Sequence, residues 1–538
     1  MSQKYSSSRF LKGAMVLTIA ALVTKVLSAV YRVPFQNIVG DIGFYIYQQV
    51  YPFYGIAIAL STYGFPVIIS KMVAEKLEGD DEEGAKRVAV TSFLFLCFVG
   101  FSWFLLVYFG AGVIARWMGD PLLKPLLQVI SLSFLLLAPL SVIRGYYQGK
   151  EDMVPTAVSQ VTEQSIRVAT ILIFSTILVT QGYSLYMTGK GALFGSITGG
   201  LGGLLVLLTF LTARREKLFS RKYLSLPADY VQIWSRLFKN GTAICVSAML
   251  LVLLQFVDSL NVYSLLLSSG MEAESAKTWK GIYDRGQPFV QLGTVVATSI
   301  SLTIVPLVTN AYLKRRESLV REYSQLSLKI SITIGFAATL GIINIMVPTN
   351  TMLFENALGS RVIAVFCLSI FFSCLILTFA GIFQGIGRIY YPAFCIVVGI
   401  LAKYLGNACL IPVMGVMGAS ISTVGSLSII AIMMVVKLRK WFPIRFFPFS
   451  FYKTLLLSGA AMTIGLQGLL WIYDTLLDNG MPGRPLSVLF SIGGVCIGGL
   501  IFLIVFLRGN VLSRDDISFL PFGSKWLWLM NKVQPNNK

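Results

Sequence analysis

Long apolar stretches separated by short polar segments fill the chain from residue 10 to residue 507. Most of them have at least the length of about 20 residues that an α-helix needs to cross a bilayer. They are continuous rather than alternating, which argues against the strands of a β-barrel. The pattern therefore predicts an all-α polytopic membrane protein with about 14 transmembrane helices. The predicted spans are 10–36, 45–70, 88–114, 125–147, 153–180, 191–213, 239–267, 286–312, 327–348, 360–385, 392–411, 415–436, 452–473 and 487–507.

Two short patterns recur in the two halves of the chain at one spacing. RGYYQGKEDMVPTAV, which contains Gln148, resembles AGIFQGIGRIYYPAFCIV, which contains Gln384, and the two residue numbers differ by 236. YPFYGIAIALST around Pro52 and QPFVQLGTVVAT around Pro288 show the same difference. Gly and Pro are common at turns, which leaves chance as an alternative. Two matches at one offset nevertheless favour an internal duplication.

The repeat predicts two lobes of six helices, related by an axis along the membrane normal because both halves begin on the same side. In transporters built this way, the substrate site lies near the middle of the membrane between the repeats. Segments 214–239 and 515–533 mix Leu, Phe and Trp with basic residues, which is typical of helices on an anionic membrane surface. The predicted parts are an N-terminal lobe at 1–213, an amphipathic cytoplasmic linker at 214–238, a C-terminal lobe at 239–440, two additional transmembrane helices at 441–510 and a cytoplasmic tail at 511–538.

Composition and charge distribution fit a membrane protein and predict its orientation. Hydrophobic residues make up 56% of the 538 positions and charged residues 13%, whereas a soluble domain has about 25% charged residues. The net charge is +20; 32 of the 44 Lys and Arg residues fall on one side of the predicted membrane and seven on the other. Arg144 counts toward the first group and Lys280 toward the second. The positive-inside rule therefore predicts a multi-pass membrane protein with both termini cytoplasmic and no nucleic-acid partner.

The sequence lacks the residues and motifs of common enzyme chemistry. It contains no histidine, which removes His-based acid–base catalysis and His-ligated metals. Its seven cysteines lie in apolar spans without a C-x-x-C motif, so they predict neither disulfides nor a metal cluster. It has no P-loop, no G-x-S-x-G and no H-E-x-x-H. We therefore expect a protein that is not an enzyme and that uses no cofactor or metal.

Five basic residues lie inside the predicted spans, where a charge costs roughly 2.5–3.5 kcal/mol on insertion scales. Such residues usually face a polar cavity and serve function. Three acidic residues lie among them or at the edge of a span, so the cavity has surplus positive charge and predicts transport of an anion. The basic residues are Lys25, Arg32, Arg167, Arg285 and Lys403, and the acidic residues are Glu163, Asp258 and Asp284.

Spacing suggests roles for the charges of the first half. Lys25 and Arg32 are two helical turns apart and project from nearly the same face of the first span. The alternative for Arg32 is that its side chain extends to the outer membrane surface. Glu163 and Arg167 are an i, i+4 pair, which predicts mutual neutralisation with either a structural or a functional role.

The charges of the second half are more isolated in the sequence. Asp258 and Lys403 are deep single charges, expected to pair with each other or with residues of the other half. Asp258 is also the best candidate for coupling transport to a proton or another cation. Asp284 and Arg285 enter the eighth span from outside, where placement at the membrane interface is the alternative to a role in the cavity.

Four segments within the first 410 residues resemble the multidrug/oligosaccharidyl-lipid/polysaccharide (MOP) exporter superfamily. They are TKVLSAVYRVPFQNIVG, YGFPVIISKMVAE, RGYYQGKEDMVPTAVSQVTEQ and YDRGQPFVQLGT. The resemblance is strongest to the polysaccharide-transporter branch, which holds lipid II flippases and the stage V sporulation protein B group of Gram-positive bacteria. Two six-helix halves followed by two extra helices agree with this branch.

The resemblance implies a V-shaped bundle of two lobes around a central cationic cavity. Flippases of this branch use cavity arginines on spans one and eight to hold the pyrophosphate of an undecaprenyl-linked sugar, and Lys25, Arg32 and Arg285 match those places. The last two helices of lipid II flippases form a groove for the lipid tail. Gram-negative lipid II flippases also carry an acid and a further arginine around span two. The interior of span two lacks charge here, which leaves the saccharide open.

The leading hypothesis is a flippase that moves a lipid-linked anionic saccharide to the outer leaflet by alternating access. An ion gradient of H⁺ or Na⁺, or the membrane potential, would drive it. The alternative is a drug/cation antiporter of the related multidrug (MATE) branch, which needs acidic cavity residues and is disfavoured by the excess of bases. A third possibility is a scaffold for an envelope synthase, which predicts that the intramembrane charges can be replaced without loss.

Overall fold

The structure is a computed structural model that describes residues 2–219, 230–441, 447–478, 481, 483–509 and 511. These residues form helices and turns without a strand, so the predicted all-α class is confirmed. Within them, 12 helical stretches are long and apolar enough to cross a membrane, and the first, Met15–Glu78, covers the first two predicted spans. The predicted number of about fourteen is not confirmed by this count.

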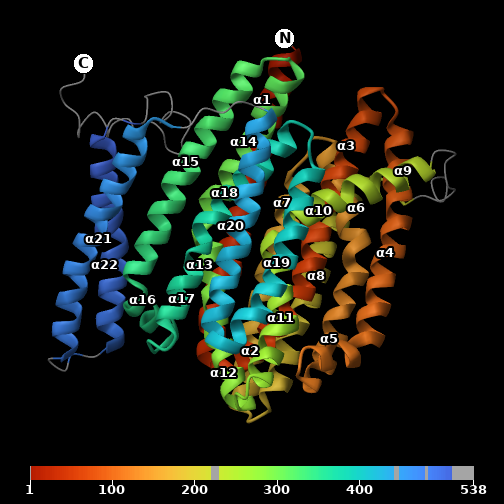
Figure 1. Cartoon of the computed structure of the whole chain (residues 1–538). Helices are drawn as coiled ribbons and strands as arrows, with labels where there is room; N and C mark the ends of the chain where they lie inside the picture. The colour runs from red at the N-terminus through yellow and green to blue at the C-terminus, as the bar shows by residue number, and fades with distance from the viewer. Residues whose placement is uncertain are drawn as a thin grey trace. The chain divides into compact units, whose positions relative to one another are not determined.

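Contacts divide the chain into two compact units, whose helices are labelled in Figure 1. The first unit consists of residues 1–292 and 388–426, and the second of residues 293–387 and 427–538. The first unit contains α1 (Ser2–Val30), α2 (Arg32–Ala59), α3 (Phe65–Glu78), α4 (Glu82–Trp117), α5 (Lys124–Ser131), α6 (Leu137–Gly149), α7 (Val154–Thr180), α8 (Leu185–Ala213), α9 (Tyr230–Arg236), α10 (Thr242–Ala248), α11 (Leu250–Ser268), α12 (Ala273–Asp284), α13 (Gly286–Gly293, up to residue 292) and α19 (Tyr390–Met414).

The second unit contains α14 (Val295–Leu313), α15 (Glu317–Asn344), α16 (Met346–Phe354), α17 (Ser360–Cys367), α18 (Ser369–Gly385), α21 (Phe449–Asp478) and α22 (Gly483–Arg508). Helix α20 (Val416–Trp441) contributes residues up to 426 to the first unit and the rest to the second. The division into lobes at 1–213 and 239–440 stays a prediction.

A turn at Gly40 separates the first two predicted spans. The backbone of α2 leaves the helical conformation there, with φ at +67° and ψ at −175°. A positive φ is strained for residues with a Cβ atom, which explains why glycine occupies this position. Asp41 follows the turn directly, and the helix then continues through a short π-helical segment, Leu60–Gly64, into α3.

Helices α3 and α6 in the first unit, and α14 and α18 in the second, make the same kind of close contact through glycine. A Cβ atom on Gly149 of α6 would lie 2.6 Å from Val73 of α3, and one on Gly385 of α18 would lie 2.8 Å from Val308 of α14. The contact is repeated one turn earlier by Gly145 and Gly381. Equivalent glycines of the two units differ by 236 in residue number, which supports the internal duplication predicted from the sequence.

The last two helices belong to the second unit. In Figure 1, α21 and α22 run side by side next to α15, and both pack against it. Their core is apolar and includes Phe451, Met462, Leu466, Phe502 and Phe506. The outward faces are apolar too, because Ile464 is 74% exposed and Trp471 71% exposed. Such faces suit contact with lipid tails.

Glu216, at the start of the predicted linker, forms hydrogen bonds with residues at the end of α6. Glu216 accepts hydrogen bonds from the Tyr146 hydroxyl at 3.0 Å and from the Lys150 ammonium. Partial burial alone would raise the pKa of Glu216, but the hydrogen bond and charge of Lys150, with the bond from Tyr146, lower that pKa overall. Of the two predicted surface helices, 515–533 lies outside the described residues, and 214–239 is described only at its two ends.

Candidate functional site

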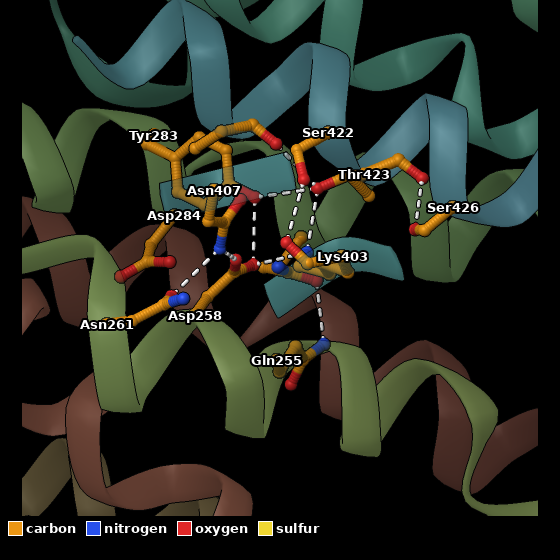
Figure 2. A network of polar contacts seen from close by, with 12 residues as sticks. Gln255, Asp258, Asn261, Tyr283, Asp284, Lys403, Asn407, Ser422, Thr423 and Ser426 are labelled. Carbon is orange, nitrogen blue, oxygen red and sulfur yellow. Dashed lines mark hydrogen bonds and ion pairs between the residues drawn. The ribbon is translucent and has the colours of Figure 1, made fainter. Parts of the chain in front are cut away.

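The first unit holds a group of buried charged side chains, and Figure 2 shows the part around Asp258 of α11. The ammonium group of Lys403, from α19, donates to Asp258 Oδ2 at 2.8 Å and to Thr423 Oγ1 at 2.7 Å. The charged side chains are 1% and 2% exposed. From the sequence, Lys403 was expected to pair either with Asp258 or with a residue of the other half. In the structure it pairs with Asp258.

Two further side chains complete the hydrogen bonds of this carboxylate. The Tyr283 hydroxyl, from α12, donates to Asp258 Oδ2 at 2.8 Å, and Asn407 Nδ2 donates to Oδ1 at 3.1 Å. Asn407 lies one helical turn after Lys403 on α19, so both reach Asp258 from one helix face. A buried ion pair of this kind is satisfied because its remaining lone pairs also have donors. Both oxygens of the Asp258 carboxylate therefore accept hydrogen bonds, and Lys403 balances its charge.

Arg285 pairs with Asp41, an acid that the sequence analysis missed. Its Nε donates to Asp41 Oδ1 at 2.9 Å, and its NH2 donates to Oδ1 and Oδ2 at 2.6 and 2.7 Å. The segment after the Gly40 turn can approach α12 because residue 281 is a glycine, and a Cβ atom on Gly281 would collide with the backbone of Asp41. Asp41 was overlooked because it lies between two predicted spans. Its carboxylate compensates the charge of Arg285.

Lys280 and Asp284 form a second ion pair, one turn apart on α12. The Lys280 ammonium lies 2.7 Å from each carboxylate oxygen, and its side chain is 1% exposed. Lys280 was counted with the basic residues of the outer face, whereas the structure buries it in this ion pair; its side of the membrane stays a prediction. Lys280 lies before the apolar run that predicts span eight, so hydropathy did not indicate that it is buried. Its i, i+4 spacing to Asp284 could have indicated the ion pair.

The predicted ion pair between Glu163 and Arg167 is wrong. Glu163 pairs instead with Arg144 of α6, whose NH2 donates to Glu163 Oε2 at 2.6 Å. Arg144 also donates to Thr62 Oγ1 at 2.9 Å and to Ser159 Oγ at 2.8 Å. It is fully buried within α6, although the charge count had placed it at the cytoplasmic side, and that side stays a prediction. The i, i+4 spacing suggested a basic partner for Glu163 on its own helix, α7. In the structure the partner comes from the neighbouring helix α6.

Arg32 and Arg167 are buried without an acidic partner in the part of the chain that the structure describes. Their exposed fractions are 0% and 1%. The Arg32 guanidinium carbon lies 4.6 Å from the ring centre of Tyr51, and that of Arg167 lies 5.8 Å from the same ring. Nε of both residues and NH2 of Arg167 have no hydrogen-bond partner in the described part. This side of the unit therefore carries excess positive charge.

Aromatic rings surround these two guanidinium groups. Arg167 lies 5.2 Å from the ring centre of Tyr31 and 4.7 Å from that of Tyr54. The hydroxyls of Tyr31 and Tyr47 are 3.0 Å apart. We call Tyr31, Tyr47, Tyr51 and Tyr54 the tyrosine cage. Cation–π contacts stabilise such cations by about 0.5–2 kcal/mol each, but they supply no negative charge.

Three other observations concern the predicted site residues. Lys25 is half-buried on α1, and its role stays a prediction. The Gln291 amide, with its oxygen turned toward Arg32, accepts from both terminal nitrogens at 3.2 Å. Among the described residues, no cluster of three or more Asp, Glu, Cys or His side chains could hold a metal ion.

The chain is similar in sequence to several known proteins. The family model described as "Polysaccharide biosynthesis protein" matches residues 10–312. An uncharacterized membrane protein of Bacillus subtilis (strain 168), YabM, is 39% identical over 530 residues, which cover 98% of this chain and 97% of YabM. Lipid II flippase MurJ of the same organism is 24% identical over 94% of this chain and 97% of the relative.

Two solved structures have the same fold. An inward closed structure of lipid II flippase MurJ matches with a TM-score of 0.68 and 15% identity, over 93% of this chain and 100% of that chain. An inward-facing MATE multidrug transporter of the MOP superfamily matches with a TM-score of 0.66 and 17% identity, over 80% of this chain and 98% of the other. At these identities the two structures establish the fold alone.

Proposed function

Because the chain belongs to the polysaccharide biosynthesis protein family, in the polysaccharide-transporter branch of the MOP superfamily, we propose that it is a flippase for a lipid-linked anionic saccharide. The family places it among multi-pass membrane transporters, and the cargo is the proposed part. The proposed cargo is an undecaprenyl-pyrophosphate-linked saccharide, either lipid II or another precursor of a cell-envelope polysaccharide.

This proposal rests on the excess of buried basic side chains over buried acidic ones. Every buried carboxylate that the structure describes has a basic partner, while Arg32 and Arg167 have no ion-pair partner among the described acidic residues. Two uncompensated guanidinium groups at membrane depth are costly, and a diphosphate would balance them. The paired carboxylates are Asp120 with Lys277, Glu163 with Arg144, Asp258 with Lys403 and Asp284 with Lys280.

The other predicted cations take secondary roles in this mechanism. Lys25 helps to attract the diphosphate, while Arg285 and Lys403 contribute only when their acidic partners are displaced during alternating access. Asp258 is the proposed group for coupling to H⁺ or another cation, and the membrane potential is the alternative driving force. Both termini lie in the cytoplasm in this proposal, as the distribution of Lys and Arg predicts.

The drug/cation antiporter of the MATE branch is the second candidate. MATE structures share the fold, but an antiporter for cations needs carboxylates that can bind its cargo. The paired state of the buried acids disfavours that activity. A scaffold without transport activity is disfavoured because it gives no reason for burying Arg32 and Arg167 without an acidic partner among the described residues.

Complementation tests the proposal. The chain would be expressed in a bacterial strain whose own lipid II flippases can be switched off, together with Arg32→Ala, Arg167→Ala and Arg285→Ala variants. We expect rescue by the wild type and loss of rescue for Arg32→Ala and Arg167→Ala. Arg285→Ala should reduce rescue less, because its charge is compensated by Asp41.

Controls separate transport from folding. Membrane levels of every variant would be compared by immunoblot, and Arg361→Ala, at an exposed position, serves as the matched arginine control. Full rescue by Arg32→Ala and Arg167→Ala would contradict the cationic site. Failure of well-expressed wild type to rescue would exclude lipid II as the cargo and direct the test to strains that lack other polysaccharide flippases.

A further inference from the structure

Arg144 and Arg167 are both possible partners of Glu163, and only Arg144 forms the ion pair. Arg167 lies four residues after Glu163 on α7, at a spacing that brings side chains of one helix face together. Arg144 lies on α6, and its NH2 donates to Glu163 Oε2 at 2.6 Å. The other carboxylate oxygen, Oε1, accepts from the Tyr54 hydroxyl at 3.4 Å. Both oxygens of Glu163 are therefore engaged by groups from other helices.

Further hydrogen bonds hold the Arg144 guanidinium beside this carboxylate. Its NH1 donates to Thr62 Oγ1 at 2.9 Å, and its NH2 donates to Ser159 Oγ at 2.8 Å. The Arg144 side chain is fully buried, and that of Glu163 is 5% exposed. A buried ion pair is stable when additional hydrogen bonds satisfy its charged groups, as they do here. These contacts explain why Glu163 pairs with Arg144 in preference to the arginine on its own helix.

The choice of partner sets the charge beside the tyrosine cage. Glu163 and Arg144 balance each other, so Arg167 keeps a positive charge without an acidic partner among the described residues. If residue 144 were neutral, the buried carboxylate of Glu163 would lose its counter-charge, and Arg167 would be the base one turn away. An acid that precedes a base by four residues is the favourable order for such a pair on a helix. Arg167 would then be neutralised too.

The Arg144–Glu163 pair occurs in only one half of the repeat. The offset of 236 relates Arg144 of α6 to Ala380 of α18. The same offset relates Glu163 of α7 to Gly399 of α19. Neither equivalent residue carries a charge, although both helices form. The repeated helices therefore do not require the pair, which points to a role specific to the first half.

We propose that Arg144 is a positioning residue of the transport site, because it holds Glu163 away from Arg167 and leaves the charge of Arg167 available to an anionic cargo. This inference rests on the proposed function and adds to it a residue that acts through another side chain. It also assigns a source of specificity. With Glu163 on Arg167, the site would lose its positive charge there and with it the preference for an anion over a neutral molecule.

Complementation in the flippase-depleted strain tests the consequence for transport. Arg144→Met should lose rescue while reaching the membrane at the level of the wild type, because Glu163 then neutralises Arg167. Arg144→Lys should keep rescue, because its ammonium carries the charge that holds Glu163. Arg144→Met/Glu163→Gln should regain rescue, because no carboxylate is left to neutralise Arg167. Arg361→Met, at an exposed position, is the matched control and should rescue fully.

Thermal unfolding separates this role from a purely structural one. The Tm of the purified full-length protein would be followed by tryptophan fluorescence in dodecyl maltoside, with Arg167→Met introduced into the wild type and into Arg144→Met. In the wild type, Arg167→Met should leave the Tm unchanged or raise it, because it removes a buried charge that has no acidic partner among the described residues. In Arg144→Met it removes the new partner of Glu163, so the Tm should fall by about 3 °C or more.

A different effect of Arg167→Met in the two backgrounds, together with loss of rescue in Arg144→Met, supports the proposal. Equal shifts in Tm would overturn it, because Glu163 then does not transfer to Arg167. Full rescue by Arg144→Met would overturn it too, and so would absence of Arg144→Met from the membrane, since Glu163 then finds no new partner. If the wild type does not rescue, lipid II is rejected as the cargo, and the two Tm shifts still decide whether Arg144 holds Glu163 away from Arg167.

Discussion

Removing either member of the Asp258–Lys403 pair should destabilise the protein by about 3–5 kcal/mol, because the remaining charge stays buried without compensation. In Lys403→Met, the carboxylate keeps its hydrogen bonds from Tyr283 and Asn407 but loses its counter-charge. In Asp258→Asn, the ammonium keeps Thr423 as an acceptor and likewise loses its counter-charge.

The double variant Asp258→Asn/Lys403→Met should recover part of this loss. Both charges are gone, and the amide that replaces the carboxylate can still accept a hydrogen bond from Tyr283. Contacting residues couple by up to about 3 kcal/mol, so the double variant should cost about 2–3 kcal/mol less than the sum of the single variants. A cycle of four proteins therefore measures the pair itself rather than the loss of two side chains.

Equilibrium unfolding of the full-length protein would be followed by tryptophan fluorescence during SDS titration in dodecyl maltoside. The matched control is Arg484→Ala, which breaks an ion pair whose side chains are 48% and 53% exposed. Exposed pairs contribute only about 0–1 kcal/mol. If Lys403→Met and Asp258→Asn cost no more than this control, or if the double variant equals the sum of the singles, the buried network does not stabilise the protein as described.

Two other predictions concern helix packing and pH. Gly149→Ala and Gly385→Ala should each cost about 1–3 kcal/mol, because the added Cβ collides with the facing helix, whereas Gly468→Ala, with nothing within 4 Å, should be neutral or stabilise by up to about 1 kcal/mol in the same titration. The lowered pKa of Glu216 contributes stability above the unfolded pKa of about 4.3, and this is lost as pH falls through the folded pKa. The difference in Tm between wild type and Lys150→Ala should therefore shrink from about pH 7 to about pH 3.

Each of these two predictions has an outcome that contradicts it. Equal effects of alanine at Gly149 and Gly468 would mean that the close helix contact does not limit packing. A difference in Tm that stays constant across the pH range would mean that Lys150 does not act through the Glu216 carboxylate.

The sequence predicted the class of fold, the repeat and the presence of buried charge, because these depend on composition and spacing. Long apolar runs have few alternatives to membrane helices, and a constant offset between repeated motifs can be found without a structure. Asp258 and Lys403 were also expected as one possible pair, because a buried charge is stabilised by a buried charge of opposite sign.

Partners on other helices were not predictable in the same way. Glu163 had two arginines within reach, Arg167 one turn away on its own helix and Arg144 on another, and sequence spacing indicates only the first. Asp41 was outside every predicted span, and only the turn at Gly40 shows why it reaches Arg285. As a result, the sequence treated five basic residues as one cationic set, although two of them are compensated in the structure.

The glycine contacts constrain how the protein can change shape. Helices that touch through side chains can slide by changing rotamers, but Gly149 and Gly385 leave no such freedom. A shift of less than one turn along either helix would bring a larger residue against Val73 or Val308. We therefore expect α3 and α6 to move together as one rigid body, and likewise α14 and α18. Movements during transport would then occur at the other helix contacts and in the segments that connect the helices.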